Sequence, residues 1–144
     1  TELDCRLPLV MLVSKAPTAE EIRQYGSVAD GLGVSLSCVI SGVDSQGEPE
    51  VTELVEKCHG SSMFVHAWTV RTDDLPDWCE STDELLDALI RKAGVDGIFA
   101  DQPDAVAAWR LKASAQKPAS GPFRLLNKGR DSSSGSDPER SKPQ

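Results

Sequence analysis

The 144-residue sequence predicts an α/β fold of about four strand–helix units, followed by a disordered tail. Short apolar runs typical of buried parallel strands alternate with segments whose apolar residues recur at helical spacing. From residue 114 this periodicity stops, and Ser, Pro, Lys, Gly and Asp dominate. Alternating strands and helices predict parallel strands joined by right-handed crossovers. Four units in residues 1–113 match half of a (β/α)₈ barrel, and they equally match a small open α/β sheet.

The first two units occupy roughly the first sixty residues. The run 7–13 predicts a strand with Pro8 near its start, and Thr18–Glu21 reads as the capping box of a helix that points Ile22 and Tyr25 inward. A second strand is expected over 27–33, ending in glycines. A Ser/Gly/Asp-rich linker over 41–48 should lead to a helix that starts near Glu50 and stops at Gly60. Its apolar stripe would be Val51, Leu54, Val55 and Cys58.

The last two units follow the same pattern. A strand is expected over 63–70, then an acidic loop over 71–77, then a helix that a second capping box, Ser81–Glu84, begins and Gly94 ends. Its apolar stripe is Leu85, Leu86, Leu89, Ile90 and Ala93. The fourth strand covers 94–101. Pro103 suits the first turn of a short last helix that turns Val106, Trp109 and the stem of Arg110 inward.

Charge and composition narrow the functional classes. The chain carries −8, and residues 114–144 contribute +3, so residues 1–113 carry −11. So acidic a body would repel nucleic acid and anionic membranes. No apolar run is long enough for a membrane span, and no signal-like segment is present. The chain starts at Thr1, so we expect processing or a longer parent, and a periplasmic or secreted location would need a signal upstream.

The four cysteines are expected to be small, partly buried thiols. No pair has the CxxC spacing of a zinc site, and although the even count permits two disulfides, a chain of this length with an apolar core does not need them. They are Cys5, Cys38, Cys58 and Cys79.

Three stretches resemble one enzyme family. Residues 64–71, Phe-Val-His-Ala-Trp-Thr-Val-Arg, look like the seventh barrel strand of glycerophosphodiester phosphodiesterases. Residues 93–104 are similar to the family's closing Gly-Val-Asp-Gly-Val-Phe-Thr-Asp-x-Pro-Asp, and residues 29–33 look like the Ala-Asp-Gly-Ile-Gly of its periplasmic-type subgroup. Ala67, Trp68 and Ala100 depart from the usual Pro, Tyr and Thr. The resemblance covers roughly residues 7–111 and implies the second, carboxy-terminal half of a TIM barrel.

The resemblance implies hydrolysis of glycerophosphodiesters to glycerol 3-phosphate and an alcohol, in lipid and glycerol metabolism, with a divalent metal, calcium or magnesium. In the family the catalytic groups are a His-Arg-Gly run, a Glu-x-Asp pair and a second histidine, all in the first half of the barrel. The sequence has no His-Arg-Gly run, so we expect no catalytic residue and no metal ligand in this chain. The carboxylate pair Glu48/Glu50 is expected to be solvated or to cap a helix, with metal binding as the alternative. The pair Asp73/Asp74 lies in a loop and would alternatively line the mouth of the barrel.

The resemblance points to three candidate substrate-binding residues, because a barrel site lies at the carboxyl ends of the strands. Trp68 would stack on a glycerol or head-group face, or pack in the core. Arg71 would bind a phosphate, or pair with Asp73 or Asp74. Asp101 would accept a hydrogen bond from substrate, or cap the helix at Pro103. The two histidines are expected to be structural, with His66 packed in its strand and His59 at a helix end.

Three functions remain open from the sequence. The first is an enzyme fragment whose substrate is a glycerophosphodiester and which is inactive alone. The second is a non-enzymatic half-barrel that binds another half or itself, since open apolar sheet edges favour self-association. The third is a small, unrelated α/β binding domain.

Overall fold

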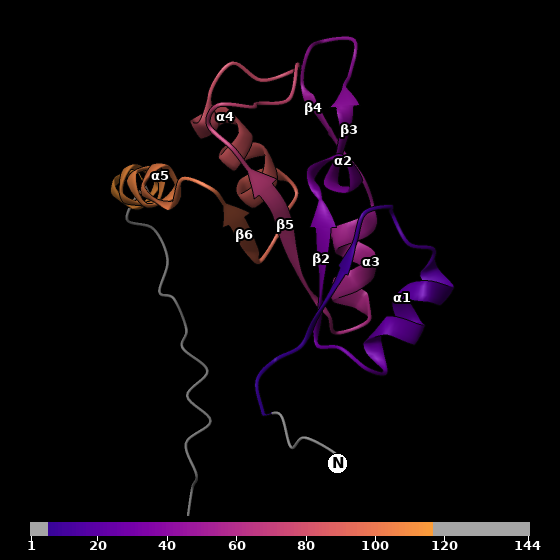
Figure 1. Ribbon diagram of the computed structural model, residues 1–144. Helices are drawn as coiled ribbons and strands as arrows, with labels where there is room; N and C mark the ends of the chain where they lie inside the picture. Colours follow the sequence, from indigo (N-terminus) through magenta and orange to yellow (C-terminus); the bar gives the residue numbers. More distant parts are fainter. Residues whose placement is uncertain (1–5, 117–144) are drawn as a thin grey trace, which may run out of the picture.

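Four parallel strands form one open sheet in the computed structural model, which describes residues 6–116 (Figure 1). Every pairing within this sheet is parallel. Side by side, the strands are β1 (Val10–Val13), β2 (Gly31–Ser35), β5 (Phe64–Val70) and β6 (Gly97–Ala100). Each strand lies next to the one that follows it in this series. That is the order in a barrel, whereas the order in a doubly wound sheet reverses at a switch point. The predicted α/β fold with a parallel sheet is confirmed.

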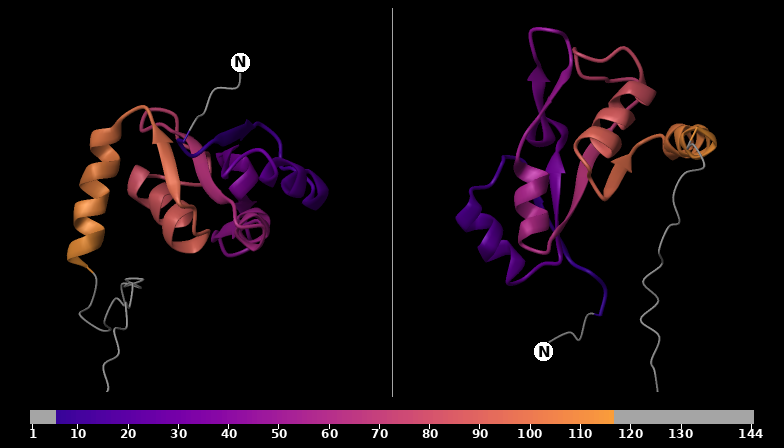
Figure 2. Two further views of the ribbon diagram at one scale, coloured as in Figure 1. Left: turned by 90° about the horizontal axis from the view of Figure 1, so that it is seen from below. Right: turned by 180° about the vertical axis from the view of Figure 1, so that it is seen from behind.

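Helices lie along one side of the sheet and beyond its two edges, while the other face carries no helix (Figure 2). They are α1 (Ala19–Gly26), α2 (Leu36–Val39), α3 (Leu54–Gly60), α4 (Thr82–Leu86), its π-helical continuation η1 (Asp87–Lys92), and α5 (Pro103–Ala115). Strand β5 shows the consequence, because Val65 and Ala67 are fully buried while Phe64, His66 and Trp68 on the other face are only half-buried. We call this second face the open face.

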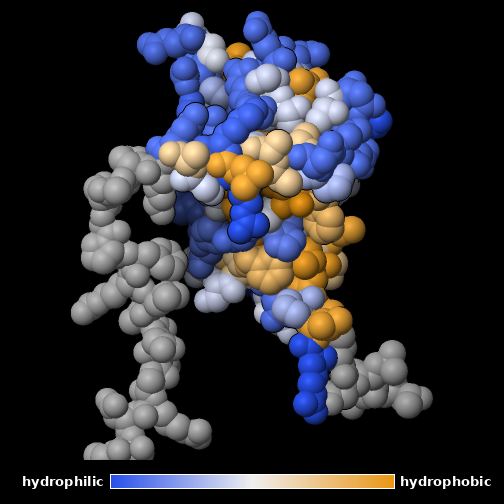
Figure 3. All heavy atoms as spheres, turned by 90° about the vertical axis from the view of Figure 1, so that its left-hand side faces the viewer, coloured by the Kyte–Doolittle hydropathy of each residue, from blue (hydrophilic) through white to orange (hydrophobic). Residues whose placement is uncertain are grey.

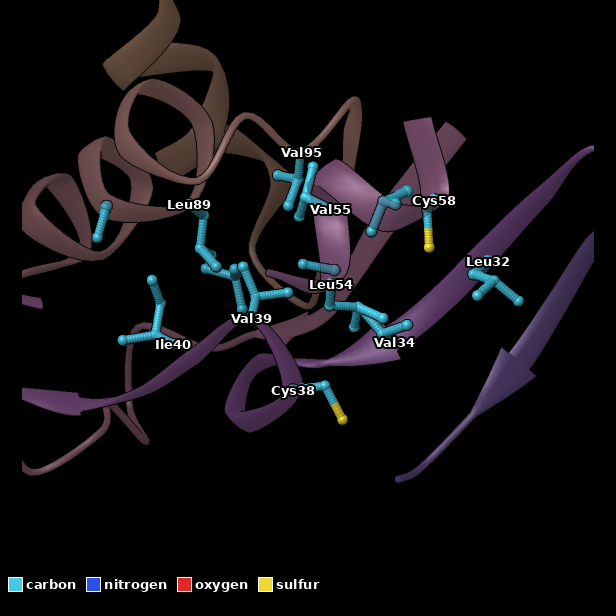
Figure 4. Packing of buried hydrophobic residues seen from close by; sticks show 14 of the residues in the cluster. Leu32, Val34, Cys38, Val39, Ile40, Leu54, Val55, Cys58, Leu89 and Val95 are labelled. Carbon is cyan, nitrogen blue, oxygen red and sulfur yellow. The ribbon is translucent and has the colours of Figure 1, made fainter. Parts of the chain in front are cut away.

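The core lies between the sheet and the helices that cover it. Figure 4 shows Val55 from α3, Leu89 from η1 and Val95 from the loop before β6 meeting above Val34 and Val39. All five are buried. Fully burying one such aliphatic side chain contributes roughly 1.5–3 kcal/mol, so this cluster holds the helices on the sheet.

The second strand was wrongly placed, because β2 begins at Gly31 where the expected strand 27–33 was to end. Its glycines lie within the strand because side chains from neighbouring strands occupy the space above them. A Cβ at Gly31 would lie 2.3 Å from the Phe64 ring, and one at Gly33 would lie 2.3 Å from Leu12 Cδ2. These glycines therefore allow close packing on the open face and do not end the strand.

The expected linker over 41–48 is a β-hairpin, and the helix expected from Glu50 starts later. Strand β3 (Ile40–Val43) pairs antiparallel with β4 (Pro49–Val51). The Asp44 carboxylate accepts from the amides of Gln46 and Glu48, at 2.8 and 3.0 Å, which closes the turn. Val51 lies in β4 and is outside the apolar stripe of α3, whose other predicted members, Leu54, Val55 and Cys58, are buried as expected.

The helix boundaries are mostly as predicted. Thr18 and Glu21 form the complete capping box of α1. At α4 only half of the box forms, because Ser81 Oγ accepts from the Glu84 amide but the Glu84 carboxylate accepts from the amide of Glu80. Gly94, at φ +77°, follows η1. Helix α5 is longer than expected and continues to Ala115, so the tail does not begin at residue 114 as predicted. The rest of the predicted tail, from residue 117 onward, lies outside the described residues.

The predicted outer strands are shorter than expected. Strand β1 begins at Val10, and Leu7 and Leu9 before it are exposed. Strand β6 covers Gly97–Ala100 within the expected 94–101. In helix α5, Trp109 is buried and Val106 is partly buried, as predicted, whereas Arg110 is exposed.

Candidate functional site

The three predicted site residues meet at the carboxyl edge of the sheet. Trp68 lies near the end of β5, Arg71 just after it, and Asp101 just after β6. Arg71 Nε lies 3.2 Å from Asp101 Oδ2. Trp68 and Asp101 line the same hollow of about 420 Å³, which Leu12 and Phe99 also border. The carboxyl ends of parallel strands converge at one edge, and in barrels of this kind ligands bind there.

Arg71 is surrounded by carboxylates. Besides Asp101, its guanidinium lies 3.2 Å from Asp73 Oδ2 and 3.9 Å from Asp74 Oδ2. The hydrogen bond from its own backbone amide and then the charge of Arg71 lower the pKa of Asp73 below its usual value. Of the two alternatives for Arg71, the structure therefore contains the ion pairs. Three carboxylates against one guanidinium leave this rim with an excess of negative charge.

Gln102 ties the acidic loop to the start of α5. Its amide group donates to Asp73 Oδ1 at 3.3 Å, and its carbonyl accepts from the Thr72 amide at 3.0 Å. Gln102 is also the N-cap residue of α5, with no capping hydrogen bond from its side chain. The Asp101 carboxylate instead faces Arg71, so the capping role considered for Asp101 is not the one the structure shows.

A second hollow also borders Trp68. It measures about 440 Å³ and lies between the end of β2 with α2 and the loop that follows β5. Its lining includes Ser35, Ser37 and Ile40 from the first of these segments and Asp74 and Trp78 from the loop. Trp68 Nε1 is buried and has no hydrogen-bond partner within the described part of the chain. Trp68 thus borders two hollows of the size that small molecules occupy.

The two histidines lie away from this edge or pack within the sheet. His66 is on the open face, with its ring centroid 4.8 Å from that of Phe64 and 5.8 Å from that of Phe99. His59 Nε2 lies 2.7 Å from Asp96 Oδ2, at the amino end of the strands. The packed arrangement expected of His66 and the structural role of His59 at the end of α3 agree with these contacts.

In two of the motifs that carried the family resemblance, an Asp-Gly pair lies at the amino end of the sheet. The Asp30 carboxylate accepts from the amide of Leu9, and the Asp96 carboxylate accepts from the amide of Val65, both at 2.8 Å. Sequence reasoning assigned no role to either aspartate. The available signal was that the Asp-Gly pair occurs twice, each time at the start of an apolar strand. The two Asp-Gly pairs therefore hold neighbouring strands together, whereas Asp101, later in the second of these motifs, lies at the candidate ligand-binding rim.

The described residues offer no evident metal centre. Within residues 6–116, no group of three His, Cys, Asp or Glu side chains is arranged to hold a metal ion. Glu48 pairs with Lys92, and the Glu50 carboxylate accepts from Ser41 Oγ at 3.2 Å. Asp73 and Asp74 are engaged with Arg71. The residues present here do not fit the divalent metal that the resemblance implies, and none is assigned as a ligand.

No helix within residues 6–116 has both the length and the apolar character needed to cross a membrane.

Comparison with known proteins adds two findings. A glycerophosphodiester phosphodiesterase from Haemophilus influenzae is 35% identical over 77 residues, which are 53% of this chain and 21% of that relative. The chain therefore aligns with about a fifth of the length of this curated relative. The model of the glycerophosphoryl diester phosphodiesterase family matches residues 1–105, and the chain belongs to that family.

Proposed function

We propose that this chain forms one side of the substrate site of a phosphodiesterase that hydrolyses glycerophosphodiesters to glycerol 3-phosphate and an alcohol. The observation that carries the proposal is the meeting of Trp68, Arg71 and Asp101 at the carboxyl edge of a parallel sheet. Family membership supplies the reaction class. In this proposal the chain is the second half of a periplasmic-type barrel and is inactive until the first half completes it.

Each of the three residues has a distinct role in this proposal. Trp68 offers its ring to the glycerol or the head group, and Asp101 accepts a hydrogen bond from a substrate hydroxyl. Arg71 already has three carboxylates around it, so its first contribution is to hold Asp101 in place at 3.2 Å. When bound, the divalent metal of the family would neutralise phosphoryl oxygens. No side chain between residues 6 and 116 is assigned to that metal.

The test is a complementation assay. The purified chain alone, with a glycerophosphodiester and calcium or magnesium, should release no glycerol 3-phosphate above background. Addition of a separately produced first half of a family barrel should restore release, and Trp68→Ala or Asp101→Asn should lower it. Turnover by the chain alone would disprove the claim that it is inactive. Failure of the complemented mixture, although the two halves bind each other, would disprove the site.

A second candidate is a half-barrel that assembles without catalysis. Leu12 and Phe99, on the open face, are 62% and 46% exposed, which is unusual for large apolar residues in a central sheet. Figure 3 shows apolar surface gathered on the side of the molecule that carries β6 and α5. Such a surface is typical of an interaction site. Measurement of the oligomeric state tests this candidate.

A further inference from the structure

We propose that the apolar groove between β6 and α5 is a docking site for residues 123–126 of the same chain, Phe-Arg-Leu-Leu. The groove has a volume of about 830 Å³ and borders β6, the last strand of the sheet. A segment docked there would compete with any other chain for this edge of the sheet. The inference goes beyond the proposed hydrolysis and does not depend on it.

The groove leaves large apolar side chains exposed, and this is the first argument. Phe99 in β6 is 46% exposed and Leu111 in α5 is 75% exposed. Both line the groove, and Figure 3 shows apolar surface gathered on this side of the molecule. Contiguous exposed apolar surface of this kind is typical of an interaction site.

Helix α5 turns one complete face toward the groove. Trp109 anchors the helix elsewhere, because it is buried and its Nε1 donates to Asp87 in η1. The residues of α5 that line the groove recur instead at the spacing of one helical face: Pro103, Val106, Ala107, Arg110, Leu111 and Ser114. A helix with two such faces needs a second partner beside the one that holds Trp109.

The residues that follow α5 supply an occupant. Residues 117–144 contain three large apolar side chains, and all three fall within four positions, at Phe123, Leu125 and Leu126. In an extended backbone successive side chains point to opposite sides. Phe123 and Leu125 would then enter the groove together while Arg124 stays in water.

The groove is within reach of this segment. Phe123 follows Gln116, the C-cap residue of α5, by seven residues, which span at most about 25 Å when extended. The groove face of α5, from Pro103 to Ser114, is about 16 Å long. A connection this short gives an effective concentration on the order of millimolar, so even a weak apolar contact would keep the groove occupied.

Charge favours the same occupant. Residues 117–130 contain two Lys and two Arg and no Asp or Glu, so they carry +4, whereas residues 1–113 carry −11. Asp101 and Asp104 flank the first lining residue of α5 and would attract this segment. Arg110, the one cation of the lining, is exposed and can keep its charge in water.

Paramagnetic relaxation in methyl NMR spectra of the full chain tests the inference. A nitroxide is attached through Asn127→Cys in a chain that carries Cys5→Ser, because the other three cysteines are buried. The methyl signals of Ile98 and Leu111 should lose roughly half of their intensity or more. Those of Ile22 in α1, beyond the far edge of the sheet (Figure 1), should keep theirs. Full intensity at Ile98 would refute docking in the groove.

A triple variant separates docking from simple proximity along the chain. Phe123→Ser, Leu125→Ser and Leu126→Ser together remove the apolar side chains and leave the label, the chain length and the charge unchanged. The broadening of the Ile98 signals should then fall severalfold. Replacement of the three serines 132–134 by alanine is the matched control and should leave the broadening as it was. Equal broadening in the triple variant and the control would overturn the proposal.

A mixing experiment distinguishes the chain's own segment from that of a second copy. One chain carries the isotope label and a different chain carries the nitroxide. The isotope-labelled chain should show no broadening at Ile98. Broadening there would mean that the segment of one copy docks on another copy, which contradicts docking within one chain.

Sedimentation velocity tests the competition for β6. The triple variant should self-associate at a severalfold lower concentration than the wild type, because β6 has lost its competitor. Weaker self-association of the triple variant would make residues 123–126 part of the contact between copies and would reject a covering role. None of these measurements involves hydrolysis, so the docking proposal and the proposed function can fail separately.

Discussion

At the scale of single residues, two aspartates act as hydrogen-bonding clamps at the amino end of the sheet. Asp30 and Asp96 each precede a strand, and each carboxylate accepts the amide hydrogen of a residue at the start of a neighbouring strand. Asp96 also accepts from His59, so one carboxylate joins β5, β6 and the end of α3. A backbone amide at a strand start has no ladder partner on that side, and the carboxylate supplies one.

The Asp96 clamp should make stability depend on pH. Burial would raise the pKa of Asp96, but the hydrogen bonds from His59 and the Val65 amide, with nearby imidazole charge, outweigh it and lower that pKa. A carboxyl whose pKa is lowered by folding stabilises fully above the unfolded value of about 3.9 and loses this contribution as the pH falls through the folded value. Asp96→Ala should lower the free energy of unfolding, measured with urea at pH 7, by about 1–2 kcal/mol.

The control for this prediction is the pH dependence of the difference in unfolding free energy between wild type and Asp96→Ala. Below the folded pKa, protonated Asp96 has lost its charge-assisted bonds, so the gap between wild type and Asp96→Ala should shrink. Asp77→Asn, at an exposed loop residue, should track the wild type throughout. A gap that stays constant from pH 7 to pH 2.5 would contradict an ionic clamp and would indicate lost packing alone.

Cys58 should be chemically inert in the folded chain. Burial raises the pKa of its thiol to about 11, so almost none of it is thiolate at pH 8. Burial also raises the pKa of Cys79. In a reaction with Ellman's reagent at pH 8, Cys58 should react only in a slow phase that urea accelerates. Replacement by Cys58→Ala should remove one thiol from that phase. Loss of a thiol from the fast phase would contradict the buried position.

At the scale of elements, the open face is built from aromatic side chains lying over glycines. A Cβ at Gly31 would lie 2.3 Å from the Phe64 ring, and one at Gly97 would lie 2.5 Å from His66 Cδ2. Phe64 and His66 come from β5, and the two glycines come from the strands on either side. The glycines therefore let the rings of the central strand lie flat across its neighbours.

A double-mutant cycle on Gly31 and Phe64 should show this coupling. Gly31→Ala should destabilise the chain by about 1–3 kcal/mol, because the ring must move from its place. Phe64→Ala should lower the free energy of unfolding by less than the same change at a fully buried phenylalanine, because Phe64 is only half-buried. In the double variant the penalty of the alanine at 31 should largely vanish, giving a clear interaction free energy in urea unfolding. Strict additivity would contradict direct contact.

The same strands show how far sequence reasoning reaches. Period-two burial along β5 and the capping box of α1 are local patterns, and both were predictable from neighbouring residues. The start of β2 was missed because Gly31 and Gly33 fit only beneath side chains distant in sequence. The hairpin β3–β4 was missed because its Ser/Gly/Asp composition is also that of a linker. The expectation that a barrel site lies at the carboxyl ends of the strands predicted that Trp68, Arg71 and Asp101 would lie together. The ion pairs of Arg71 with three carboxylates could not be predicted in full, because they depend on how the loops fold.

At the scale of the whole molecule, the sheet ends in two unpaired outer strands. Within the described chain, β1 and β6 each pair on one side only, and an apolar groove of about 830 Å³ runs between β6 and α5. Leu111 in this groove is 75% exposed. Outer strands with apolar surroundings favour pairing with another chain. Two copies related by a two-fold axis along the strands would place β6 of one beside β1 of the other, parallel, in a sheet of barrel order.

We therefore predict that the isolated chain self-associates by pairing β6 of one copy with β1 of another, which would bury the open face of each copy. Sedimentation velocity should give a mass above the monomer's 15.5 kDa and should show it falling on dilution. Leu12→Lys should shift the chain toward monomer, because the new charge would be buried on association while costing little at a residue already 62% exposed. Val28→Lys is the matched control, since Val28 is also 62% exposed but lies outside the sheet, in the turn before β2. Equal effects of the two lysines would indicate general charge repulsion, and a wild-type chain that stays monomeric at high concentration and unfolds cooperatively would reject self-assembly and leave the open face to a different partner.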